Sequence, residues 1–228
     1  MLRTRAFSAL NLNQYFQINK PDNVGNLKLN IPNERQYVLR LLIKRMFGEY
    51  QIPEKFGWIL PLVEMADSHQ KKIGIVQPFV YLTIRNGLVN TTTDDVWHVD
   101  GFSQTITHLP EQNYIWSNIE PTEYVEKSFK FPKDFDGLVH NIHNFFQNRI
   151  KESDVLKMDC ETVYGLDPYV VHRRPSNTNG KNRCFVRLSY TPIEIEDVNN
   201  TYNHLIPTNY KRDGIKEMRN KLINYDKI

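Results

Sequence analysis

The sequence contains little cysteine. Of its 228 residues only Cys160 and Cys184 are cysteines, and they form no CxxC pair. A disulfide framework and a thiolate metal site of the zinc-finger kind therefore have no basis here. Both cysteines lie in stretches predicted to form strands. We expect two buried free thiols, because unpaired cysteine behaves as a small hydrophobic residue.

Long apolar runs and a strong charge of one sign are also missing. No stretch approaches the roughly 20 apolar residues that span a membrane, and no apolar signal segment follows residues 1–7. The net charge of +3 permits an anionic ligand but lies far below the basic footprint typical of nucleic-acid binding. We therefore expect a soluble, cytoplasmic protein with no membrane partner.

The composition suits a single globular domain. Hydrophobic residues make up 40% of the chain, charged residues 24% and aromatic residues 12%, which is enough apolar surface for a sizeable core. We expect one domain over residues 1–228. Within it, residues 1–73 would form a helical N-terminal support, residues 74–192 the core, and residues 193–228 the tail.

Helical patterns are expected before the core, inside it and after it. They cover residues 33–48, 57–71, about 135–149 and, in the tail, about 215–224. Residues 1–32 contain breakers and predict no regular element.

From Gly74 onward, β-branched and aromatic residues dominate. The expected strands cover residues 75–85, 97–102, 113–117, the surroundings of 156, 161–164, 169–173 and 183–190. Helices do not alternate regularly with these strands, so parallel βαβ units are not indicated. The order predicts an α+β protein with an antiparallel sandwich or barrel.

The most informative motif is the sequence His98-Val99-Asp100. On a strand, side chains two residues apart point to the same face, so this imidazole and this carboxylate could bind one metal ion. A second imidazole, His172, lies on another expected strand. Two histidines and one carboxylate are the facial set of non-haem Fe(II) oxygenases, and these ligand types suit Fe(II), Mn(II) or Zn(II).

Two arginines lie on the strand expected after His172. Strand alternation places Arg183, Phe185, Arg187 and Ser189 on one face. An arginine that points into a protein is costly unless it meets an anion, and a bidentate pair with an organic acid would remove that cost. The alternative is that both arginines face water, or that one of them pairs with an internal Asp or Glu.

Together these residues resemble the Fe(II)/2-oxoglutarate-dependent oxygenase superfamily. The similarity rests on the His-x-Asp motif, the distal His172 and a Gly-x-x-Arg segment from Gly180 to Arg183, and it runs from about residue 74 to 192. It implies a double-stranded β-helix core (jelly roll, cupin-like). It also implies that His98, Asp100 and His172 bind Fe(II), with 2-oxoglutarate as cosubstrate.

The activity that the resemblance implies is oxidation of an unactivated C–H bond with O2, releasing succinate and CO2. Hydroxylation, demethylation and desaturation all belong to this chemistry, and the carboxylate of Asp100 disfavours halogenation. The resemblance offers two anchors for 2-oxoglutarate. Arg183 is favoured by its distance from His172, and Arg187 begins an Arg-x-Ser sequence found in other branches of the family.

Two matters stay open at the sequence level. The alternative function is a cupin-like protein that binds a metal or a ligand without oxygenase activity. The substrate could be an amino acid, a peptide or protein side chain, a nucleobase or a small metabolite; the slight basic balance and Arg187 favour an anionic or zwitterionic small molecule. His140 and His143 are expected on an exposed helix face rather than in a second metal site.

Overall fold

The fold is a mixed α+β arrangement dominated by antiparallel sheets. The computed structural model describes residues 9–46, 48–90, 96–100, 111–137 and 139–207. Its elements, in chain order, are α1 (Ala9–Tyr15), β1 (Asp22–Asn26), β2 (Gln36–Lys44), the 3-10 helix η1 (Glu54–Ile59), α2 (Leu60–Lys72), β3 (Phe79–Leu88), β4 (Gln112–Ser117), β5 (Glu123–Val125), α3 (Ile142–Gln147), η2 (Glu152–Asp154), β6 (Val155–Lys157), β7 (Thr162–Leu166), β8 (His172–Arg173), η3 (Ser176–Thr178) and β9 (Asn182–Thr191).

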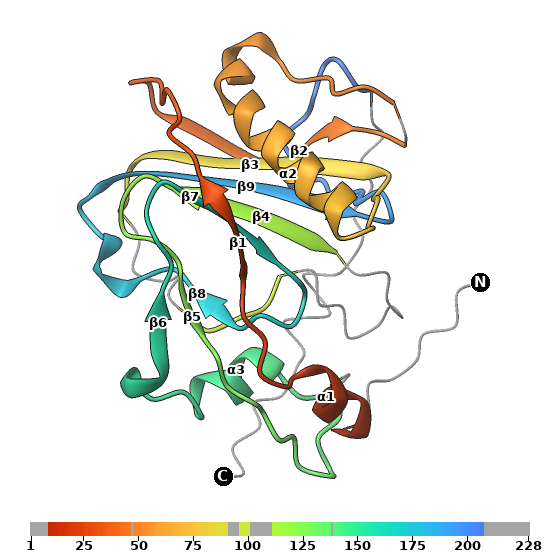
Figure 1. The fold of residues 1–228 in the computed structure, drawn as a ribbon, viewed down its shortest axis with the longest axis vertical. Helices are drawn as coiled ribbons and strands as arrows, with labels where there is room; N and C mark the ends of the chain where they lie inside the picture. Colours follow the sequence, from red (N-terminus) through yellow and green to blue (C-terminus); the bar gives the residue numbers. More distant parts are fainter. Residues whose placement is uncertain (1–8, 47, 91–95, 101–110, 138, 208–228) are drawn as a thin grey trace.

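The strands form a large and a small sheet. The six-stranded sheet has the order β1-β7-β4-β9-β3-β2, and the three-stranded sheet has the order β6-β5-β8. In Figure 1, α2 packs over the larger sheet, whereas α1 and α3 lie at the other end of the molecule, beyond the smaller sheet. Among the described residues, no helix has the length and apolar character that crossing a membrane demands.

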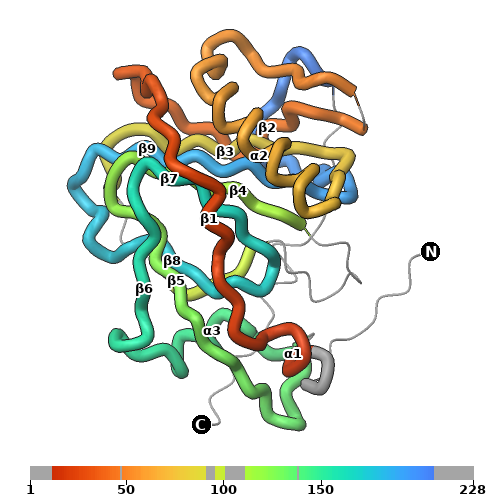
Figure 2. Tube along the Cα trace, viewed as in Figure 1, coloured from red at the N-terminus to blue at the C-terminus, as the bar shows by residue number. Residues whose placement is uncertain are grey.

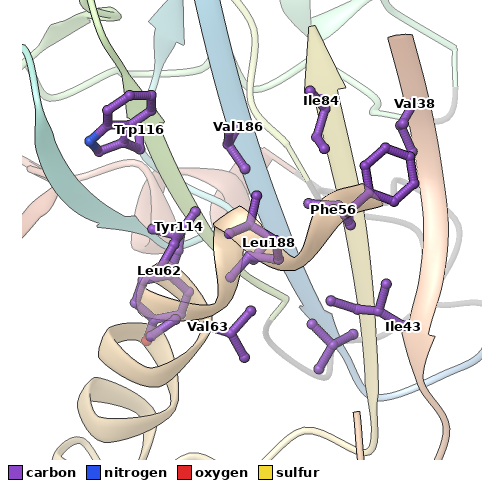
Figure 3. Packing of buried hydrophobic residues seen from close by; sticks show 14 of the residues in the cluster. Val38, Ile43, Phe56, Leu62, Val63, Ile84, Tyr114, Trp116, Val186 and Leu188 are labelled. Carbon is purple, nitrogen blue, oxygen red and sulfur yellow. The ribbon is translucent and has the colours of Figure 1, made fainter. Parts of the chain in front are cut away.

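One face of the larger sheet is apolar and packs against α2. Leu62, Val63 and Ala66 of α2 are buried at helical spacing and face alternate residues of the central strands. Figure 3 shows this core; its buried members include Val38, Phe56, Leu62, Ile84, Trp116, Val186 and Leu188. Burial of these side chains, about 1.5–3 kcal/mol each, holds the sheet and helix together.

The opposite face of the larger sheet carries several polar residues among apolar ones. Alternation along the strands places Thr83 of β3, Asn113 of β4, and Arg187 and Ser189 of β9 on it. Thr83, Asn113 and Ser189 are nevertheless buried, with exposed fractions of 3%, 0% and 3%. Buried polar groups require hydrogen-bond partners, and these three have them inside the protein.

The smaller sheet is held by a separate aromatic cluster. Trp97, Val99 and Val171 pack there with aromatic residues at the end of α1, between β5 and α3, and in α3. These aromatic residues are Phe16, Phe129, Phe131, Phe145 and Phe146. In Figure 2 the chain runs from α1 up into the larger sheet through β1, so the two ends of the molecule are tied together by the N-terminal segment. Residues 98 and 100 have the opposite parity to 97 and 99 and therefore turn away from this cluster.

The expected helix at residues 33–48 is wrong. Gln36–Lys44 form β2, which pairs antiparallel with β3, and the register shifts between Val38 and Leu41. This β-bulge places Val38 and Leu41, three residues apart, on the same apolar face, and so the sequence imitates helical spacing. Residues 1–32 also contain regular structure, namely α1 and β1, which the sequence did not predict. The N-terminal part therefore combines helices with the strands β1 and β2.

Other expected elements are found with shorter bounds. The helix at 57–71 is confirmed as η1 and α2, the inserted helix is confined to α3, and the expected strands from 113 to 190 correspond to β4 and β6 to β9. The strand expected at 97–102 is an isolated bridge at His98, with residues 101 and 102 outside the described part. The helix expected near 215–224 also falls outside it, and the described part of the tail, 193–207, contains no helix.

The expectation of two buried thiols holds for one cysteine. Cys184 is buried in β9, whereas Cys160 is exposed. Cys160 lies between β6 and β7, next to Glu161, which has a φ of 52°. A residue in this left-handed region marks a turn, and the turn brings Cys160 to the surface.

Candidate metal centre

The two expected histidine ligands lie directly opposite each other. The backbone N–H of His98 donates to the carbonyl of His172 at 2.9 Å, and the reciprocal bond is 3.0 Å long. Such a pair of bonds defines a hydrogen-bonded antiparallel position, in which opposed side chains share one face. The two imidazole centroids are consequently 4.5 Å apart.

Each imidazole is oriented by a backbone carbonyl two residues earlier. Nδ1 of His98 lies 2.8 Å from the carbonyl oxygen of Val96, and Nδ1 of His172 lies 2.9 Å from that of Val170. A carbonyl oxygen only accepts, so each Nδ1 carries the proton and each Nε2 keeps its lone pair. This is the second contact that metal-binding histidines usually make, and it leaves Nε2 available as the ligand atom.

Asp100 completes the set. One ligand atom from each of His98, Asp100 and His172 lies within 4.8 Å of the others, and Nε2 of His172 is 3.4 Å from Oδ2 of Asp100. The structure therefore brings together the three residues expected as ligands.

The charge state of this set also suits a metal ion. Burial, helped by the nearby His172, lowers the pKa of His98 to about 4, so its ring is neutral at neutral pH. Burial opposes ionisation of Asp100, but Arg187 and His172 outweigh it and hold the pKa of this carboxyl well below its usual range. A neutral imidazole and an ionised carboxylate are the protonation states that a divalent metal requires.

Arg187 connects the two sheets at this point. It extends from β9 of the larger sheet, and its Nη1 donates to Oδ2 of Asp100 beside the smaller sheet. Its Nε is buried and has no hydrogen-bond partner. For Arg187 the alternative holds, because its partner is an internal acid, Asp100.

Arg183 lies elsewhere on the same strand face. It is four residues before Arg187, which corresponds to about 13 Å along a strand, and is 5% exposed. Its Nε donates to the carbonyls of Ile119 and Glu120 at 3.2 and 2.9 Å, and its guanidinium lies 5.1 Å from the ring centre of Phe185. No carboxylate pairs with it among the described residues.

The environment of Arg183 is short of negative charge. Burial, followed by the nearby Arg174 and Arg85, lowers the pKa of Arg183 to about 10. Its Nη2 is buried without a hydrogen-bond partner. An uncompensated buried guanidinium is unfavourable unless an anion binds it.

Polar residues that the sequence did not single out line the space beside the centre. Oγ of Ser189 donates to Oδ1 of Asn113 at 2.5 Å, and Nδ2 of Asn113 donates to Oε1 of Glu111 at 3.2 Å. The only sequence signal for these contacts is the parity of Ser189 with Arg187. The positions of Asn113 and Glu111 depend on the pairing of β4 with β9.

A buried ion pair contacts both histidine-bearing segments on the side opposite the candidate ligands. Arg173, next to His172, donates through Nε to Oε2 of Glu123 at 2.7 Å. Its guanidinium also lies 4.4 Å from the ring centre of Trp97, the neighbour of His98. Arg173 therefore links both segments through contacts on the face opposite the candidate ligands.

The histidines expected on an exposed helix face are placed differently. His140 lies before α3, and its Nδ1 accepts from the backbone N–H of Asp136 at 2.9 Å. His143 lies in α3, is half-buried, and its ring centre is 6.2 Å from that of His98. The expectation of a fully exposed face is therefore wrong, because α3 packs its side chains against the smaller sheet.

Comparison with known proteins gives a distant structural likeness. No model of a known protein family matches the sequence, and no curated protein matches it. The solved structure of AviO1 from Streptomyces viridochromogenes Tue57 is similar with a TM-score of 0.42 and 15% sequence identity, over 83% of this chain and 97% of that chain. A likeness at this level assigns neither a family nor a function.

Proposed function

We propose that this chain is an Fe(II)/2-oxoglutarate-dependent oxygenase that oxidises, most simply hydroxylates, an unactivated C–H bond of a small molecule. The observation that carries the proposal is the set of His98, Asp100 and His172, with ligand atoms within 4.8 Å of one another. Both imidazoles expose Nε2 because their Nδ1 atoms donate to backbone carbonyls. Two imidazoles and one carboxylate on one side leave open positions for a cosubstrate and O2.

Strand order supports a double-stranded β-helix of jelly-roll type as the core. From β3 to β9 the chain passes several times between the sheets: β3, β4, β7 and β9 belong to the larger sheet, and β5, β6 and β8 to the smaller one. The segment at His98 adds to the smaller sheet through its bridge to His172. Two antiparallel sheets exchanging strands in this way are expected of a jelly roll.

The residues present fit Fe(II). All three donors are nitrogen or oxygen, and no cysteine belongs to the set, which suits Fe(II) better than a thiolate-preferring site. Bound there, iron would supply O2 activation coupled to decarboxylation of 2-oxoglutarate. The chain itself would hold the two imidazoles in register, keep Asp100 ionised and pair that carboxylate with Arg187.

Arg183 is the proposed anchor for the distal carboxylate of 2-oxoglutarate. Arg187 already has a carboxylate partner in Asp100, whereas the buried Nη2 of Arg183 has none. The two arginines share one face of β9, so a dicarboxylate held by Arg183 would lie on the same side of the larger sheet as Arg187 and Asp100. Arg187 would then regulate the charge of Asp100 and contact the substrate side of the site.

The experiment that tests this function is iron-dependent release of succinate from 2-oxoglutarate. Chelator-treated protein would be incubated in air with Fe(II), 2-oxoglutarate and a screen of small molecules. Succinate should exceed the iron-free control in the wild type, and His98→Ala should reduce it to that control. Absence of succinate with every compound and absence of 2-oxoglutarate affinity would refute the proposal. Tightly bound zinc in the same protein would then favour the cupin-like alternative.

A further inference from the structure

Glu111 is an acid beside the candidate metal centre that the proposed chemistry does not use. It is half-buried just before β4, and its Oε1 accepts from Nδ2 of Asn113 at 3.2 Å. Asn113 in turn accepts from Ser189, which lies on the same face of β9 as Arg187. This chain of hydrogen bonds fixes the carboxyl of Glu111 at the edge of the polar face that carries Arg187.

The other charges around Glu111 already have partners. Arg187 is paired with Asp100, and Arg40 is paired with Asp197 at 2.6 Å. Among the described residues, Glu111 makes no ion pair, and its hydrogen bond comes from a neutral amide. Of the three carboxylates near this end of the sheet, Glu111 is the one whose charge is not balanced.

The electrostatic environment agrees with that geometry. Burial, followed by the charge of Asp100, raises the pKa of Glu111, while Arg187, Asn113 and Arg40 act in the opposite direction. Asp100 and Arg187 therefore lie close enough to act on Glu111. A carboxyl in this position gains from any cation that enters the site, because the pairing replaces lost hydration.

We propose that Glu111 binds the protonated amine of the substrate, so that the substrate class is an amine or an amino-acid-like zwitterion rather than a purely anionic acid. The proposal rests on the proposed oxygenase function and names the substrate class of that same site. It also explains why Asn113, which is fully buried, bridges Glu111 and Ser189: the amide holds the carboxyl in place without neutralising it.

The test uses three probes with one carbon skeleton and different end groups: cadaverine, pentanediol and glutarate. Binding is measured by calorimetry on full-length protein saturated with Mn(II) and 2-oxoglutarate, since Mn(II) replaces Fe(II) without turnover. Cadaverine should bind at least tenfold more tightly than pentanediol or glutarate. Glu111→Gln, which keeps the size and the contact with Asn113, should abolish this preference, since a charged hydrogen bond contributes about 1.5–3 kcal/mol.

The matched control is Glu64→Gln, which removes an exposed acid from α2 on the other side of the larger sheet. It should keep the full preference for cadaverine. An equal response to the three probes, or a preference that persists in Glu111→Gln, would overturn the inference.

Failure of the proposed function would look different from failure of this inference. Mn(II) and 2-oxoglutarate affinities are measured first in every protein. If the wild type binds neither Mn(II) nor 2-oxoglutarate, the oxygenase proposal is refuted. If it binds both but shows no preference for the amine, only the role of Glu111 is refuted. Normal values in Glu111→Gln would also show that this variant is folded.

Discussion

The chemistry of His98 and His172 depends on which ring nitrogen carries the proton. In both side chains the proton is on Nδ1, because Nδ1–H donates to the carbonyl of the residue two positions earlier. The donors are fixed by the local strand conformation, so the ligand atoms Nε2 are oriented before any metal binds. Preorganised ligands lose less freedom when a metal binds than mobile ones.

Replacing the two arginines separately should give different defects. Arg183→Met removes the buried guanidinium that has no carboxylate partner, so the 2-oxoglutarate concentration needed for half-maximal succinate release should rise at least tenfold. Arg187→Met removes the partner of Asp100 instead, so it should raise that concentration less. Steady-state succinate assays on both variants measure the difference.

Far-UV circular dichroism of both variants serves as the folding control for this comparison. If Arg187→Met has the larger effect on the 2-oxoglutarate requirement, the anchor is Arg187 and the Arg-x-Ser sequence is the functional one.

The two thiols should differ in reactivity. Burial raises the pKa of Cys184 to about 12, and its side chain is buried in β9, whereas Cys160 is exposed. Because the thiolate is the reactive species, the native protein at about pH 8 should react with one equivalent of Ellman's reagent, and the denatured protein with two. Cys160→Ser should remove the native reaction, and two fast equivalents in the native protein would contradict the described burial.

Residue parity explains which parts of the site could be predicted from sequence. On an extended segment, His98 and Asp100 share one face while Trp97 and Val99 share the other, and no further information is needed. Glu111 and Arg173 could not be found this way. Their roles come from contacts with Asn113 and Trp97, and those contacts depend on strand register and sheet packing.

At the scale of elements, β2 shows how a local irregularity can hide a strand. The bulge between Val38 and Leu41 spaces apolar residues as a helix would, and Arg40 within it has a φ of 45°. Nine consecutive residues pair with β3 or flank that pairing, and this cross-strand contact outweighs the helix-like pattern. By contrast α2, whose buried residues are regularly spaced and face an apolar side of the larger sheet, was predictable.

The contacts of Arg173 should strengthen metal binding. Arg173 contacts Glu123 and Trp97, and through them it sets the separation of the segments that carry His172 and His98. Arg173→Met should weaken Mn(II) binding about 10–100-fold, the usual effect of losing a supporting contact at a metal site. Electron paramagnetic resonance of free Mn(II) measures this affinity directly.

Arg149→Met is the matched control for that variant. Arg149 lies 3.8 Å from the ring centre of Phe145 and donates through Nη1 to the carbonyl of that residue, so this guanidinium also stacks on a ring of the aromatic cluster. Its Mn(II) affinity should stay within about twofold of the wild type. Equal effects of the two substitutions would mean that general packing, and not the contacts of Arg173 with Glu123 and Trp97, determines the Mn(II) affinity.

At the scale of the whole molecule, each sheet has its own hydrophobic core, and the two sheets also meet through an ion pair and a smaller apolar cluster. The larger sheet is stabilised by α2 and the smaller sheet by the aromatic cluster of α1 and α3. Between them, Arg187 reaches across to Asp100. The space between the sheets therefore holds both a buried apolar cluster, which includes Ile115, Leu166 and the partly buried Tyr124, and the buried polar groups near Asp100.

The central claim is that His98, Asp100 and His172 hold Fe(II) together with 2-oxoglutarate. The most direct measurement is the visible spectrum of the protein with Fe(II), recorded without oxygen before and after addition of 2-oxoglutarate. A weak charge-transfer band should appear on addition, should be lost in Asp100→Ala, and should need more 2-oxoglutarate in Arg183→Met. Folded wild-type protein that gives no band at any 2-oxoglutarate concentration would contradict the account.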